Sequence, residues 1–166
     1  ISTATRVPTE PPAVRPDRAG PDPAAAAAAD PMATYPFRVR HRHRETSDTV
    51  TLVVEPVDGG PVSFAAGQFS MLYAFGVGEV PISISGDPDD DSSLTYTVRA
   101  VGGVTRALAA TPCGGVLGVR GPYGTGWDLP DAGAGADVVL VAGGLGLAPL
   151  RPVVVQLLGS RSRYRR

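Results

Sequence analysis

Gly143, Gly144 and Gly146 form a glycine-rich turn whose residue types and spacing could hold a phosphate group. They follow the apolar run 138–142, which predicts a short strand buried on both faces, and they precede Pro149. Glycines adopt positive φ and leave the main chain open to a ligand. Pro149 suits the first turn of a helix, where backbone N–H groups have no carbonyl partner. The order of strand, turn and helix start predicts a site where these N–H groups and the helix dipole attract a pyrophosphate.

The ordinary dinucleotide pattern G-x-G-x-x-G is not met at this turn. Gly144, Gly146 and Pro149 occupy its three glycine positions. A tight strand-to-helix turn that binds no ligand therefore remains an alternative. We expect Pro152 to lie in the first helical turn as well, followed by the apolar continuation Val153–Leu158.

A second candidate phosphate site lies at Gly102 and Gly103, which lead into a short predicted helix ending at Ala110. We expect Thr105 to add a hydroxyl donor at the start of this helix. Two such sites in one chain imply two phosphorylated ligands or one long ligand.

Few other residues have types that often carry chemistry. Cys113 is the single cysteine, so an intramolecular disulfide and Cys-rich zinc or iron–sulfur sites are excluded, and we expect it to be a small buried residue. His41 and His43 would share one face of a strand, yet a metal site needs further ligands that the neighbouring sequence does not supply. The acidic run 87–91 lacks the spacing of a calcium loop and predicts a solvated turn.

The composition predicts a globular domain with many turns. The chain has 166 residues, of which 21 are Gly and 17 are Pro, and a formal net charge of −1. The balanced charge argues against a general nucleic-acid-binding protein. The longest apolar stretch is too short to span a membrane, and the N-terminal residues lack the pattern of a signal peptide, so we expect a cytoplasmic protein without a membrane span.

The elements that must position these residues are mostly short strands. Residues 1–34 are expected to be a Pro/Ala-rich extension; its first 31 residues predict disorder because they have almost no large apolar side chains, and Met32 is a plausible true start. Six segments then predict strands, at 37–44, 50–55, 69–75, 82–85, 94–101 and 116–120. In the first of them, four arginines alternate with apolar and histidine residues, which predicts one very basic, solvated face. Six short strands separated by turn residues predict an antiparallel barrel.

Five motifs follow one another in an order that is typical of one superfamily. They are Gly67-Gln68-Phe69, Pro81-Ile82-Ser83-Ile84-Ser85, Gly102-Gly103-Val104-Thr105, Gly121-Pro122-Tyr123-Gly124 and the run from Gly143 to Arg151. In their order and spacing the chain resembles the ferredoxin–NADP reductase superfamily from Tyr35 to about Arg166. Within it, the chain looks most like the flavin-carrying gamma subunit of sulfhydrogenases and related hydrogenase or sulfite-reductase complexes. The electron-transfer subunit of dihydroorotate dehydrogenase is a near relative of that subunit.

The resemblance implies a mainly β fold with two parts. Residues 35–131 would form a six-stranded antiparallel Greek-key barrel with one short helix, which binds FAD. Residues 136–166 would form the first βα unit of an incomplete Rossmann-like domain for NAD or NADP. Implied flavin contacts are at Val80, Pro81, Ile82, Ser83, Thr97, Val98 and Arg99, implied pyrophosphate contacts at Gly102, Gly103, Val104 and Thr105, and implied nicotinamide dinucleotide contacts at Gly143, Gly144, Gly146, Pro149 and Arg151.

Two departures from the family pattern bear on function. Many reductases have Arg-x-Tyr-Ser in the flavin segment, where this chain has Val80-Pro81-Ile82-Ser83. Losing a phosphate-binding arginine and an aromatic platform should weaken flavin binding unless Arg99 or Arg106 compensates. A complete nicotinamide domain also needs roughly another 100 residues by usual domain size, so we expect a C-terminally truncated reductase.

The implied activity is hydride transfer between NAD(P)H and FAD, followed by transfer of electrons to an iron–sulfur or hydrogenase-type partner subunit. Ser83 is the candidate for a hydrogen bond to the flavin ring, and the protein's share of the chemistry is placement of the two cofactors. We expect FAD binding and weak or absent nicotinamide binding by this chain alone. Two alternatives are a non-catalytic docking subunit of a redox complex that has lost its flavin, and a non-functional reductase fragment.

Overall fold

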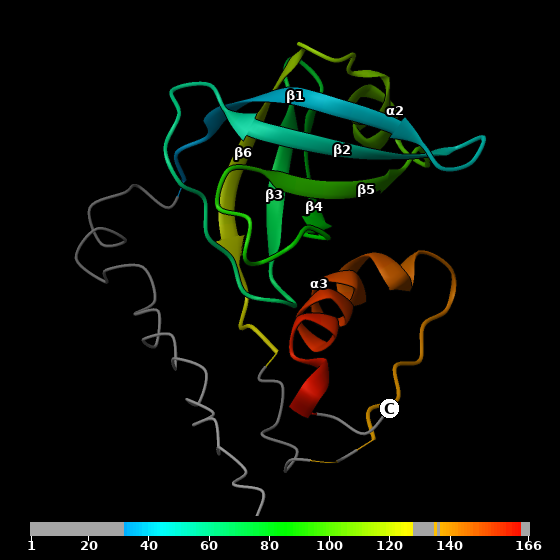
Figure 1. Ribbon diagram of the computed structural model, residues 1–166. Coiled ribbons are helices and arrows are strands. Elements are labelled where there is room, and N and C mark those ends of the chain that lie inside the picture. The colour runs from blue at the N-terminus through cyan, green and yellow to red at the C-terminus, as the bar shows by residue number, and fades with distance from the viewer. Residues whose placement is uncertain (1–31, 128–134, 136, 164–166) are drawn as a thin grey trace, which may run out of the picture.

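The computed structural model describes residues 32–127, 135 and 137–163 (Figure 1). The disorder predicted for residues 1–31 lies outside this range. The described residues form six strands: β1 Tyr35–Arg44, β2 Thr49–Pro56, β3 Phe69–Ala74, β4 Gly78–Ser83, β5 Leu94–Arg99 and β6 Val116–Tyr123. They form one sheet in the order β4-β3-β6-β1-β2-β5, and all neighbouring pairs are antiparallel. The predicted mainly β, six-stranded antiparallel fold is therefore confirmed.

The sheet curls until its two edge strands approach each other, but it does not close completely (Figure 1). An isolated bridge joins Ile84, just after β4, to Tyr96 in β5, and the N–H of Ser85 donates to the carbonyl of Thr95 over 2.8 Å. Within β4 and β5 themselves, no ladder joins the two strands. The sheet therefore has an open edge between β4 and β5.

Apolar side chains that alternate along the strands fill the interior of the curled sheet. Helix α2, Gly103–Ala110, packs across strands β3, β5 and β4 and inserts the fully buried Leu108 into the core. The hydroxyl of Tyr96 donates to Ser70 Oγ over 2.8 Å inside this core, so that both buried polar groups are paired. Burial of this apolar cluster is the main stabilising contribution that fixes β4, β5 and α2 relative to one another.

Strand β1 contains a bulge that the sequence pattern did not reveal. The register with β2 shifts between Val39 and His41, which leaves Arg40 as the extra residue. Because side chains alternate, one extra residue exchanges the two faces of the strand beyond it. All four arginines are exposed, as predicted, but the prediction that they share one face is wrong. Arg42 pairs with the inward-facing Leu52, and its Nε donates to the carbonyl of Ala109 at the end of α2 over 3.0 Å.

The C-terminal part consists of the 3-10 turn η1, Gly144–Gly146, helix α3, Leu147–Gly159, and the short η2, Arg161–Arg163. The predicted helix is confirmed, although Pro152 lies inside α3 rather than in its first turn. The predicted buried strand at 138–142 is wrong, since these residues form no strand and the side chains of Val139 and Val141 are 82% and 85% exposed. A strand needs a hydrogen-bonded neighbour, and no described segment pairs with this one.

Candidate functional site

The flavin segment implied by the resemblance is strand β4, at the open edge of the sheet. Val80 and Ile82 pair with inward-facing residues of β3 and pack against the core, whereas Pro81 and Ser83 lie on the opposite, outer face. A proline in an edge strand costs no ladder hydrogen bond. Of the four implied contacts in β4, only Pro81 and Ser83 thus have side chains on the outer face.

Strand β5 forms the other side of the open edge. Val98 is fully buried, and Thr97 and Arg99 alternate with it on the outer face. The Thr97 hydroxyl lies 3.0 Å from the Thr51 hydroxyl and 3.5 Å from that of Ser85. The outer faces of β4 and β5 thus carry hydroxyl groups and a guanidinium beside the open edge. Such groups can bind and orient a ligand.

The start of helix α2 lies directly after β5, with Gly102 as its N-cap residue. N–H groups in the first turn of a helix have no intrahelical acceptor. A Cβ added to Gly103 would meet no atom within 4 Å, so the main chain faces open space there. These N–H groups can therefore be approached by an anion such as a pyrophosphate.

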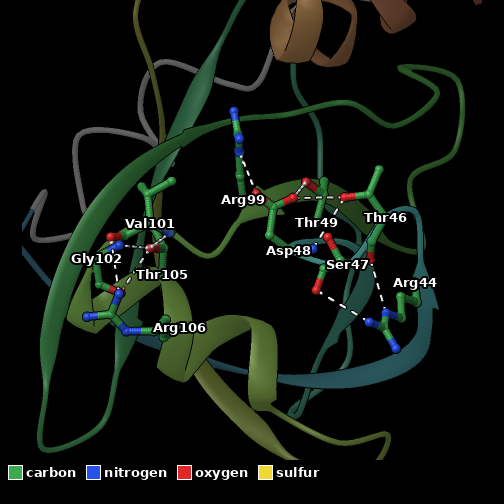
Figure 2. A network of polar contacts seen from close by, with 10 residues as sticks. All are labelled: Arg44, Thr46, Ser47, Asp48, Thr49, Arg99, Val101, Gly102, Thr105 and Arg106. Atoms are coloured by element: carbon green, nitrogen blue, oxygen red, sulfur yellow. Dashed lines mark hydrogen bonds and ion pairs between the residues drawn. The ribbon is translucent and has the colours of Figure 1, made fainter.

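Thr105 does not have the free hydroxyl donor that the sequence suggested. Its Oγ1 accepts the N–H of Gly102 over 2.8 Å and that of Val101 over 3.0 Å, and it donates to the Gly102 carbonyl over 3.2 Å (Figure 2). The side chain is buried and closes the loop before the helix. Thr105 therefore shapes the candidate phosphate site instead of adding a donor to it.

Of the two cations that could replace the missing family arginine, Arg106 is already engaged. Its Nη1 donates to the carbonyl of Val101 over 3.2 Å, on the same loop that Thr105 closes (Figure 2). Arg99 is engaged only through Nε, which donates to Asp48 Oδ2 over 2.8 Å. Its two terminal nitrogens have no partner among the described residues, so Arg99 keeps donors that a ligand could use.

Asp48, in the turn between β1 and β2, is the residue at this site that the sequence analysis missed. Hydrogen bonds from Arg99, Thr46 and Thr49, with that from Arg99 the strongest influence, lower the pKa of Asp48 to about 2. The carboxylate is therefore charged at neutral pH. The Thr-Ser-Asp sequence showed that a turn would form there, but no local pattern showed that the turn would meet residue 99.

The glycine turn before α3 has fewer features of a phosphate site than the start of α2 has. Only Gly144 of its three glycines has positive φ, at 51°, and Cβ atoms at Gly143, Gly144 and Gly146 would meet nothing within 4 Å. Nη1 of Arg151, an implied dinucleotide contact, instead donates to the carbonyl of Ser85 over 2.6 Å. This bond ties α3 to the loop that follows the flavin segment, and Pro152 beside it is buried.

Two of the five family motifs contact each other and serve the fold. Gln68 donates to the carbonyl of Gly124 and accepts the N–H of Ala65, each over 2.8 Å. A Cβ on Gly67, whose φ is 95°, would lie 2.8 Å from the Trp127 ring, so only glycine fits this close approach. These motifs hold the loop before β3 against the chain that follows β6.

Cysteine and histidine are the other described residues to which the sequence drew attention. Cys113 is exposed, contrary to expectation, because it lies in the turn between α2 and β6. His41 and His43 lie on one face of β1, as predicted, and both are exposed. Across residues 32–127, 135 and 137–163, no group of three His, Cys, Asp or Glu side chains could hold a metal ion.

None of the described helices is both long enough and apolar enough to cross a membrane.

With this arrangement of sheet and helices, the chain has the fold of ferredoxin reductase-like proteins. Phthalate dioxygenase reductase superposes with a TM-score of 0.70 at 18% identity, covering 82% of this chain and 44% of that one. The Amycolatopsis cytochrome P450 reductase GcoB gives 0.66 at 28% identity, covering 79% and 41%. No family model matches the chain.

Sequence relatives narrow this class. Over 102 residues the chain is 41% identical to the sulfhydrogenase 1 subunit gamma of Pyrococcus furiosus, which covers 61% of this chain and 35% of that protein. Over 126 residues it is 37% identical to the probable dihydroorotate dehydrogenase B (NAD(+)), electron transfer subunit, of Methanopyrus kandleri, covering 76% and 45%. The chain is a homologue of these gamma and electron-transfer subunits, as its motifs implied, and it spans less than half the length of either.

Proposed function

We propose that this chain is the FAD-binding part of an electron-transfer oxidoreductase subunit that works between NAD(P)H and an iron–sulfur or hydrogenase-type partner. The observation that carries the proposal is the open edge of the sheet with the accessible start of α2 beside it. The relatives, a sulfhydrogenase gamma subunit and a probable electron-transfer subunit, support the same class of function. A cytoplasmic location stays a prediction from the sequence.

The described residues would fit FAD at two places, its ring and its pyrophosphate. Pro81, Ser83 and Thr97 would lie along its ring, with Ser83 offering a hydrogen bond, while the N–H groups of Gly103 and Val104 would bind the pyrophosphate. When bound, FAD supplies the ability to accept a hydride and to release electrons singly. The chain's own contribution is to hold the cofactor in one orientation at the sheet edge.

Nicotinamide binding is proposed to need more than these residues. The segment before the glycine turn is not paired into a sheet, and Arg151 is engaged with Ser85. We expect NADH or NADPH to reduce dyes through this chain far more slowly than through an intact reductase. A rate equal to that of an intact reductase, measured with FAD added, would contradict this expectation.

The test of the proposed function is a visible absorption spectrum after FAD addition and desalting, followed by a fluorescence titration with FAD. We expect retained flavin bands for the natural chain. Gly103→Val should weaken FAD binding at least tenfold, because its side chain fills space that now faces the ligand without touching the protein. Ala110→Val is the matched control, since Ala110 is exposed at the opposite end of α2. A folded but colourless natural chain would overturn the proposal and favour a docking subunit without flavin.

A further inference from the structure

Hydrogen bonds within the β1–β2 turn hold the carboxylate of Asp48 in place. Asp48 Oδ1 accepts the hydroxyls of Thr46 over 2.8 Å and Thr49 over 3.0 Å, and the main-chain carbonyl of Asp48 accepts the N–H of Ala100 over 2.7 Å (Figure 2). Arg44 Nε in turn donates to the Thr46 carbonyl over 3.0 Å. These contacts fix Asp48 independently of the residue that it meets in β5.

Arg99 contacts this carboxylate through a single nitrogen. A guanidinium commonly pairs with a carboxylate through two nitrogens, but Arg99 uses Nε alone, at 2.8 Å from Oδ2. Both terminal nitrogens therefore remain available, and Figure 2 shows the guanidinium extending away from the turn, clear of the other labelled side chains. The two side chains are 58% and 41% exposed, and ion pairs so exposed contribute little to stability.

Arg99 lies close in sequence to the candidate phosphate site at the start of α2. Arg99 ends β5, and Gly102, the N-cap of α2, follows three residues later. Arg106, on the first turns of α2, is turned back to the loop carbonyl of Val101. Of these two arginines, Arg99 is thus the one whose terminal nitrogens have no partner among the described residues.

We propose that Asp48 is a positioning residue, which holds Arg99 through Nε so that its terminal nitrogens face a phosphate group bound at the start of α2. This inference rests on the proposed binding of FAD. Asp48 would not touch the ligand, and its own negative charge opposes an anion, so any benefit must act through the orientation of Arg99. Because the two effects have opposite signs, an experiment can separate the orientation of Arg99 from the charge of Asp48.

The experiment is a double-mutant cycle on the full chain with Asp48→Asn, Arg99→Gln and the combined variant. FAD is the phosphate-bearing probe and riboflavin the phosphate-free probe, both titrated by fluorescence at a salt concentration that screens long-range charge. We expect Arg99→Gln to weaken FAD binding roughly tenfold and Asp48→Asn roughly fivefold, as for loss or misplacement of one charge-assisted hydrogen bond. In the Arg99→Gln background, Asp48→Asn should cause no further loss, and riboflavin binding should not change in any variant.

Asp58→Asn is the matched control, because Asp58 lies exposed in the next turn. A second measurement needs no ligand: the Arg99 Nε–H signal in a nitrogen-15 NMR spectrum should exchange slowly in the natural chain and be lost in Asp48→Asn. Unchanged FAD binding in Asp48→Asn, an equal loss in the Arg99→Gln background, or a persistent Nε–H signal would each overturn the positioning role. A natural chain that binds no FAD would instead overturn the proposed function on which it rests.

Discussion

At the scale of residues, the candidate site depends on which side chains are already engaged within the protein. Thr105, Arg106 and Arg151 all have the chemistry to bind phosphate, yet each makes hydrogen bonds to main-chain groups of the loops around the site. Sequence reasoning assigned Thr105 and Arg151 to ligands because residue type and motif position were all it could weigh. Hydrogen-bond partners far apart in sequence, such as Asp48 and Arg99, cannot be read from either.

The stability of the fold at acid pH should depend on the ionisation of the Asp48 carboxylate. A carboxyl group whose pKa is lower in the folded than in the unfolded chain stabilises the fold above its unfolded pKa and loses that effect as pH falls through the folded value. For Asp48, this loss should run from about pH 4, its ordinary value, down to about 2. Melting temperatures of the natural chain and Asp48→Asn, measured between pH 2 and 6, should differ most above pH 4 and converge near pH 2. A difference that stays constant with pH would contradict this assignment.

At the scale of elements, strand positions were largely predictable and their pairing was not. Alternation placed β2, β3 and β5 within two residues of their ends, because half-buried strands alternate between core and surface. Strand β4 was placed several residues too late, since Glu79 and Pro81 interrupt its apolar pattern on the outer face. The bulge at Arg40 and the unpaired run 138–142 depend on neighbouring strands, which a local pattern does not contain.

The hydrogen bond of Arg151 should contribute to the docking of helix α3, together with the packing of Pro152 and Val153. Replacing Arg151 by Ala removes the donor to the Ser85 carbonyl, so we expect faster amide hydrogen exchange throughout 147–159, with exchange in β2 and β5 unchanged. Arg151→Lys should restore part of the protection, because an ammonium can donate to the same carbonyl. Arg161→Ala serves as a control near the end of the helix. Equal protection of α3 in Arg151→Ala would show that Pro152 and Val153 dock the helix by packing alone.

At the scale of the whole molecule, the chain combines a well-packed sheet with an apolar segment that nothing described here covers. Val139 and Val141 are 82% and 85% exposed, and their segment has the composition of a buried strand. Its relatives are more than twice as long as the parts that this chain matches. The apolar composition of 138–142 predicted a buried strand that is not formed, because no described segment supplies the neighbouring strand that it would need.

This segment should govern the solution behaviour of the isolated chain. Exposed β-branched runs promote association between chains. The double substitution Val139→Ser and Val141→Ser should raise the concentration at which the chain stays monomeric, by light scattering, without lowering its melting temperature. Val50→Ser, in the buried core, is the contrasting variant and should lower the melting temperature. A fall in melting temperature for the Val139/Val141 variant would show that the run is packed in solution.

The open edge between β4 and β5 also links the supply of ligand to the lifetime of the chain. A closed barrel satisfies its edges internally, whereas here a ligand held by both edges would bind the folded chain and not the unfolded one. Such a ligand stabilises the fold by mass action, by about 2.7 kcal/mol at a hundredfold excess over Kd. Proteases that degrade unfolded chains would then spare the molecules that have acquired a ligand. The steady-state amount of protein in a cell would follow the availability of the cofactor as well as the rate of synthesis.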